Sequence, residues 1–168
     1  MIELEHQGFV QRTPFSGTQV PKLTVEDALN IFDIRIELEP LAVFLAGPKL
    51  TEDDLAVLQQ IAEQSSAATR VEDLDVFFEK HLNFRKKIWA WSGNPYLQQA
   101  LERVVIPLYG LYLIRRTRNS EGILQAALDC VEHQDRILTA YRDKDFKLAR
   151  RVARDFLVHI KDYLKSRG

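Results

Sequence analysis

Cysteine, glycine and proline are scarce in this chain. Of its 168 residues, one is cysteine, seven are glycine and six are proline. The single thiol, Cys130, excludes an internal disulfide, so packing must hold the fold together, as suits a protein of the reducing cytoplasm. The few glycines and prolines leave long uninterrupted stretches, and this favours long helices.

Long apolar runs and an excess of charge of one sign are also missing. The chain has 23 basic and 24 acidic residues and a formal net charge of −1, so no overall basic field attracts nucleic acid. No apolar run approaches the ~20 residues that span a bilayer. The first residues lack the basic region and apolar core of a secretory signal. With 46% hydrophobic residues, we expect one globular domain with a sizeable core, in the cytoplasm and away from membranes.

Start and stop signals divide residues 24–165 into helices. Thr24 and Thr51 each stand three residues before an aspartate, as in a capping box, and Asn94 precedes Pro95 as an N-cap precedes a first-turn proline. Pro107 should kink or briefly break the fourth helix. The predicted helices cover about 24–47, 51–65, 72–91, 95–118, 120–142 and 146–165. Short connections between long helices predict an all-α fold, an antiparallel bundle of six to seven helices.

Residues 7–20 depart from the helical pattern. The stretches 8–11 and 18–20 read as two short strands around a turn at 14–17, which contains Pro14 and Gly17. A lone hairpin is only marginally stable in water. We therefore expect this short β-hairpin to lean on the rest of the chain or on a part that is absent.

Polar residues interrupt the apolar faces of four predicted helices. Spacings of three and four place Arg35, then His81 and Arg85, then His133, and finally His159 within otherwise apolar ladders. A buried charge or imidazole without a partner is costly. Four such faces packed together would pool their polar residues in one core cavity for a ligand or a metal.

Three local patterns follow one another in a set order. The first helix contains R-x-x-L-E-x-x-A from Arg35 to Ala42. The third has Phe84 before Arg85, and S-G-N-P-x-L follows it at 92–97. The last two helices carry Glu132-His133 before Ile137-Leu138, then Ala149 and His159. Together these patterns resemble the FadR branch of the GntR-type bacterial transcription regulators.

The resemblance implies a fold and a setting for this chain. Residues 24–168 would form an all-helical domain that binds an effector and dimerises. Residues 1–23 would be the remnant of a winged helix-turn-helix, namely the end of its recognition helix and its wing. Arg12 and Thr18 would then be candidate DNA contacts, although most of the DNA-binding half is missing from the chain.

Many members of that family hold a metal with an Asp and a His four residues apart and one His from each of two later helices. The matching positions here are His81, Arg85, His133 and His159. Three imidazoles suit zinc or nickel, but a guanidinium about 4 Å away would repel a divalent ion by several kcal/mol at an effective dielectric near 20. Two readings stay open: a metal held by the three histidines, or a metal-free cavity in which Arg85 binds a ligand carboxylate directly.

Three further residues are candidates for the same cavity. Arg35 could reach the ligand or simply pair with Glu39 on its own helix. Tyr109 and Tyr112 follow Pro107 and could line the cavity wall. The predicted effector-binding set is therefore Arg35, His81, Arg85, Tyr109, Tyr112, His133 and His159.

The leading prediction is the effector-binding, dimerising half of a transcription regulator that senses a small organic acid. One alternative is a metal-dependent enzyme with a three-histidine site. Against it, the polar residues on the apolar helix faces include no acidic residue placed as a general base, and the sequence has no nucleophile motif or phosphate-binding loop. We therefore expect that the chain is not an enzyme. A stand-alone ligand-binding module without DNA contact is the third reading.

Overall fold

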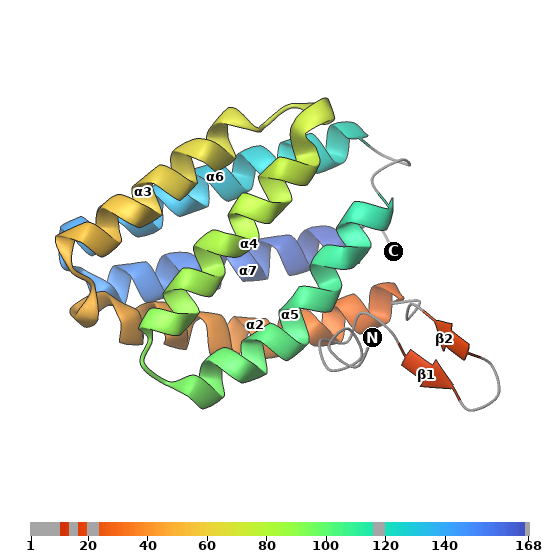
Figure 1. The fold of residues 1–168 in the computed structure, drawn as a ribbon, viewed down its shortest axis with the longest axis horizontal. Coiled ribbons are helices and arrows are strands. Elements are labelled where there is room, and N and C mark those ends of the chain that lie inside the picture. The colour runs from red at the N-terminus through yellow and green to blue at the C-terminus, as the bar shows by residue number, and fades with distance from the viewer. Residues whose placement is uncertain (1–10, 14–16, 20–23, 116–119, 167–168) are drawn as a thin grey trace.

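The computed structural model describes residues 11–13, 17–19, 24–115 and 120–166, and the side chains within 24–70, 72–109 and 122–166. Six α-helices are present in these residues (Figure 1). They are α2 (Val25–Ala46), α3 (Glu52–Ala67), α4 (Leu74–Trp91), α5 (Pro95–Arg115), α6 (Ser120–Arg142) and α7 (Phe146–Lys165). Two 3₁₀ turns, η1 (Gly47–Lys49) and η2 (Val71–Asp73), precede α3 and α4.

The helix boundaries agree with the sequence signals, and the all-α fold is confirmed. Both threonine capping boxes are present, with Thr24 Oγ1 accepting from the backbone of Asp27 and Thr51 Oγ1 from that of Asp54. Asn94 Oδ1 accepts from the backbone of Leu97 at the start of α5. The predicted end of that helix, residues 116–118, lies outside the described residues. Among the described residues, no helix has both the length and the apolarity needed to cross a membrane.

Two short strands precede the bundle in the chain. Strand β1 (Gln11–Thr13) pairs antiparallel with β2 (Gly17–Gln19), and Arg12 is opposite Thr18 in the register. The remaining residues of the predicted hairpin, including 8–10 and 14–16, lie outside the described part of the chain. So do the side chains of Arg12 and Thr18.

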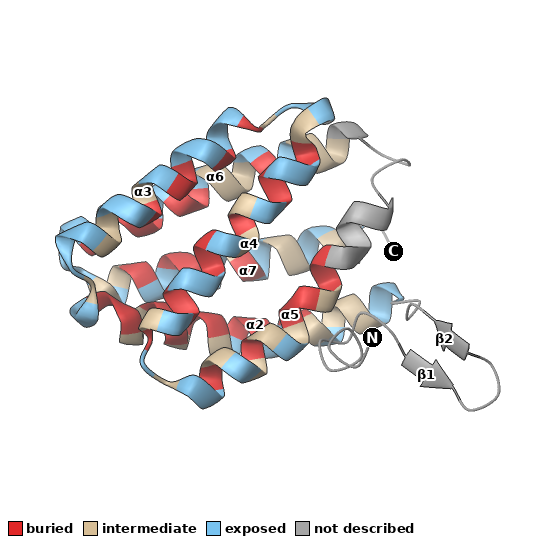
Figure 2. Cartoon of the chain, in the orientation of Figure 1, coloured by how far each residue is buried: buried red, intermediate tan, exposed pale blue. Residues whose placement is uncertain are grey.

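The core lies between two pairs of helices, α3 with α6 and α2 with α7. Helices α3 and α6 pack together, α2 lies along α7, and α4 crosses between these pairs and touches α2, α3, α5 and α6 (Figure 1). Buried residues face inward on every helix, while exposed ones form the outer faces (Figure 2). Because α4 crosses α2, its central turns, which carry His81 and Arg85, lie against the turns of α2 that carry Arg35 and Glu39.

A proline in the middle of α2 is compensated by α7. Pro40 has no N–H to donate to the carbonyl of Ile36, so this carbonyl lacks its usual donor within the helix. Arg154 Nη1 donates to this carbonyl at 3.3 Å and also pairs with Glu37 at 3.0 Å. Together with the Lys161–Asp33 ion pair, this contact ties α7 to the turn of α2 that carries the candidate site.

Gly93 ends α4 in the left-handed conformation, with φ of 68°. A Cβ there would also crowd Lys49, whose amine donates to the Ser92 carbonyl. Gly93→Ala should lower the free energy of unfolding by about 1–2 kcal/mol, as measured by urea denaturation. Gly93→Asn should lose less, because asparagine tolerates this conformation better. Equal losses in the two variants would show that crowding, and not the backbone conformation, sets the cost.

Candidate functional site

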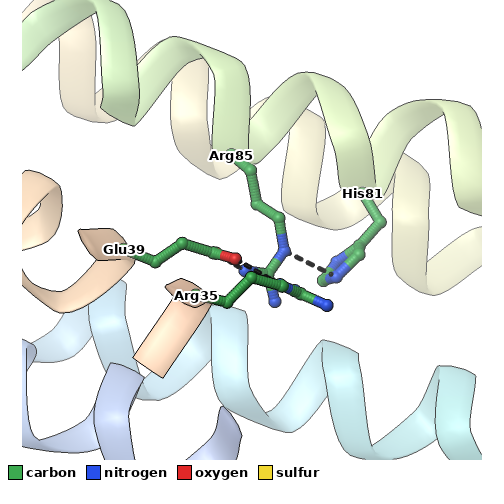
Figure 3. A network of polar contacts seen from close by, with 4 residues as sticks. All are labelled: Arg35, Glu39, His81 and Arg85. Carbon is green, nitrogen blue, oxygen red and sulfur yellow. Dashed lines mark hydrogen bonds and ion pairs between the residues drawn. The ribbon is translucent and has the colours of Figure 1, made fainter. Parts of the chain in front are cut away.

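Two helices bring four charged or titratable side chains together in the core. Helix α2 carries Arg35 and Glu39 one turn apart, and α4 carries His81 and Arg85 one turn apart, so the two pairs face each other (Figure 3). Arg35 Nε donates to Glu39 Oε1 at 2.5 Å, and Arg85 Nη1 donates to Glu39 Oε2. Arg85 Nε donates to His81 Nε2 at 3.1 Å. All four residues are between 3% and 7% exposed.

Glu39 is held as an anion by its two partners. Burial by itself would raise the pKa of this carboxyl, but the charges and hydrogen bonds of Arg35 and Arg85 outweigh burial and lower it. Burial would likewise lower the pKa of Arg85, yet Glu39 raises it above its usual value. The cluster therefore contains two guanidinium cations and one carboxylate.

The two buried histidines are neutral. The pKa of His81 falls well below 6.5, first because of burial and then because of the Arg85 charge beside it. The same two causes, in the same order, lower the pKa of His133. Because the Nε2 atom of His81 accepts a hydrogen bond from Arg85, the proton of the neutral ring must sit on Nδ1.

A cavity of ≈ 170 Å³ opens beside this cluster. Arg35, His81 and Arg85 line one end of it, and Tyr109 and Cys130 also contribute. The rest of the described wall is mostly apolar and includes Phe32, Phe78, Phe156, Leu157, Ile160 and Leu164, together with Tyr163. Burial raises the pKa of Cys130 to about 12 and raises that of Tyr109 too, so both groups stay protonated. The result is an apolar chamber with a cationic end.

His133 lies next to this chamber but does not line it. Its ring stacks on Phe156 with centroids 4.1 Å apart, and Phe156 in turn is part of the cavity wall. His133 instead lines a second space of ≈ 20 Å³ together with Glu39, His81 and Gln134. Polar atoms of His81, His133 and Gln134 have no hydrogen-bond partner among the described residues. This space has about the volume of one water molecule and the polar atoms to hold it.

His159 departs from the sequence-based expectation. It is exposed and lines neither cavity. The physical reason is helix geometry, because His159 lies about 200° around α7 from the buried Leu157. The predicted convergence of His81, His133 and His159 is therefore not found. Tyr112 cannot be placed either, since its side chain lies outside the described residues.

The described residues do not fit a divalent metal held by three histidines, the first of the two readings left open by the sequence. No group of three His, Cys, Asp or Glu side chains among them is arranged to hold one. The Nε2 lone pair of His81 is taken by Arg85, and the guanidinium puts a fixed positive charge beside the two histidines. Of the two readings left open by the sequence, this geometry favours the one in which arginine faces the ligand.

The sequence did not reveal one connection in this site. The Arg35–Glu39 pair, one of the two alternatives for Arg35, is present, and Arg35 also lines the cavity, so that its contact with a ligand stays a prediction. The second arginine on Glu39 was missed, since Arg85 is 46 residues away along the chain. One signal in the sequence pointed to such a partner: Glu39 lies on the buried face of α2, between Ile36 and Val43, and a buried carboxylate needs cationic or hydrogen-bonding partners.

The neutral histidines predict a pH dependence of stability. The unfolded chain takes up protons near pH 6.5 that the folded His81 and His133 refuse, so the free energy of unfolding should fall as the pH drops below about 6.5. The slope approaches about 1.4 kcal/mol per pH unit for each histidine. Urea denaturation between pH 7 and pH 5 measures it. His133→Gln should reduce the slope by about half, and an unchanged slope would contradict neutral burial of His133.

Comparison with known proteins supplies the family. The FCD domain matches residues 30–159. The chain belongs to the FCD-domain family. Among its relatives, the HTH-type regulator YdhC of Bacillus subtilis is 30% identical over 103 residues, which is 60% of this chain and 46% of YdhC. The HTH-type transcriptional regulator McbR of Escherichia coli is 29% identical over 133 residues, which is 79% of this chain and 58% of McbR.

The fold of this FCD domain is also that of a solved regulator. The structure of E. coli McbR/YncC superimposes with a TM-score of 0.81 at 24% identity, covering 99% of this chain and 82% of that one. The FCD chain spans about half the length of the curated relatives it matches. Those relatives are HTH-type transcription regulators, and the family resemblance read from the sequence is confirmed by the FCD match.

Proposed function

We propose that this FCD domain is the effector-binding and dimerising part of a cytoplasmic, DNA-binding transcription regulator, and that it senses a small organic acid. One observation carries the proposal, namely that two buried arginines, which share the single carboxylate of Glu39, line one end of a mostly apolar cavity. A carboxylate ligand would supply the missing counter-charge and accept short, charge-assisted hydrogen bonds.

Helix α2 offers a route from the ligand to the DNA-binding part. It carries Arg35 at the cavity and begins at Val25, directly after residues 1–23. In this proposal residues 1–23 belong to a winged helix-turn-helix, and Arg12 and Thr18 face DNA on its wing. A ligand that binds one position of α2 better than another would shift the equilibrium between two arrangements of the DNA-binding heads.

A screen of small molecules tests the effector site. Calorimetric unfolding of the domain is followed with organic acids and with neutral compounds of similar size. At a concentration 100 times its dissociation constant, a true ligand should add about 2.7 kcal/mol to the free energy of unfolding. At the same ligand concentration, Arg35→Met should cut this gain to about 0.3–1.4 kcal/mol, as a 10- to 150-fold weaker affinity implies. Arg142→Met should keep the full gain, because Arg142 is exposed and bonds Gln59. A gain that Arg35→Met leaves unchanged would place the ligand elsewhere.

Dimerisation is tested separately by sedimentation equilibrium. At tens of micromolar, the chain should sediment at about twice its monomer mass of 19.5 kDa. A mass of 19.5 kDa at that concentration would contradict the proposal that this domain alone carries the dimer interface.

A further inference from the structure

The cluster of Arg35, Glu39 and Arg85 has one more positive charge than negative charges. Arg35 and Arg85 each contribute one positive charge and Glu39 contributes one negative charge. The other buried titratable side chains around the cavities, His81, Tyr109, Cys130 and His133, are neutral. Among the described residues the cluster therefore carries a net charge of +1 in the core, and an uncompensated buried charge is unfavourable.

The surplus charge faces the larger cavity. Glu39 does not line that cavity, so its carboxylate lies behind the two guanidinium groups. Arg35 donates to Glu39 through Nε, and in the described part of the chain neither of its terminal nitrogens donates a hydrogen bond. The flat guanidinium of Arg35 rests on the ring of Phe32 at 4.4 Å, and this contact fixes its orientation. Figure 3 shows its terminal nitrogens pointing away from Glu39.

The remaining wall limits the rest of the ligand. Seven of the fifteen described residues around this volume of ≈ 170 Å³ are phenylalanine, leucine or isoleucine, and the hydroxyl groups of Tyr109 and Tyr163 and the thiol of Cys130 belong to the same wall. An apolar cavity of about 150 Å³ holds one benzene molecule. Among the described lining residues, a second charged group at the far end of the ligand would meet no cationic side chain, while a neutral ligand would leave the surplus charge uncompensated.

We propose that the cavity selects a monocarboxylate with one compact apolar body, about the size of a benzene ring, and binds it directly through Arg35 and Arg85 without a metal ion. This inference rests on the proposed effector function and adds the charge, the size and the metal independence of the ligand.

A matched set of ligands tests the charge. Isothermal titration calorimetry in the presence of EDTA compares benzoate, its neutral analogue benzamide and the dianion terephthalate, with hexanoate as a second monoanion. Benzoate or hexanoate should bind at least tenfold more tightly than benzamide and terephthalate, and EDTA should leave the affinity unchanged. Tighter binding of terephthalate, or binding that requires added zinc or nickel, would overturn the inference and leave the proposed function standing. Tighter binding of benzamide would overturn both. Absence of binding by every probe would overturn the inference alone, because the proposed function fails only if the wider screen of organic acids finds no ligand.

Two single variants test the residues. Arg35→Met and Arg85→Met each bring the net charge of the cluster to zero and leave Glu39 paired with the other arginine, so both should fold. Each should weaken monoanion binding by roughly 10- to 150-fold, as expected for a lost charge-assisted hydrogen bond, and should change benzamide binding little. Arg142→Met is the matched control and should bind like the wild type. Equal losses for benzoate and benzamide would show that the arginines only shape the cavity, and would overturn the inference.

Discussion

Replacing Glu39 with alanine should lower the free energy of unfolding by about 3–5 kcal/mol. The substitution leaves two guanidinium groups buried beside each other with no anion between them. Urea denaturation at pH 7.5 measures the loss. Glu37→Ala is the matched control, because Glu37 is an exposed glutamate on the same helix that also pairs with an arginine. An exposed pair contributes about 0–1 kcal/mol, so similar losses in the two variants would contradict a buried charge cluster.

Removing all three charges together should have the opposite effect on stability. In the triple variant Arg35→Met, Glu39→Leu, Arg85→Met, apolar side chains of similar length replace the cluster. Replacing a buried ion network with packed apolar residues is often neutral or stabilising by about 1–4 kcal/mol. We therefore expect the triple variant to be at least as stable as the wild type and more stable than Glu39→Ala by several kcal/mol.

The same triple variant should no longer bind organic acids. If it loses stability as strongly as Glu39→Ala, the cluster serves mainly to hold the fold. If it is stable and ligand binding is lost, the charges are kept for recognition. Combining the unfolding curve with a benzoate titration on one protein separates these two roles.

The helices were predictable because their signals are local. Thr24, Thr51 and Asn94 each cap a helix through atoms three residues away, so the sequence alone contains both partners. Pro107 shows the limit of such rules. Helix α5 continues through it as one element, so the predicted break is not found, and the predicted kink stays a prediction. The helix packs against α2 and α4.

The site was predictable only in part, because it depends on contacts between helices. Arg35, His81 and Arg85 were identified from their places on apolar ladders, and all three line the cavity. The same rule failed for His159, which stands in a ladder of three- and four-residue steps yet lies outside the buried stripe of α7. The Arg85–Glu39 pair needed the crossing of α4 over α2, which no spacing within one helix specifies.

A crystal structure of the domain grown with benzoate tests the central claim most directly. The account predicts the ring in the apolar cavity beside Phe32 and Phe156, and the carboxylate within about 2.7–2.9 Å of nitrogens of Arg35 and Arg85. Glu39 should keep its contacts with both arginines. Benzoate bound outside this cavity, or inside it with the carboxylate turned away from both arginines, would contradict the account.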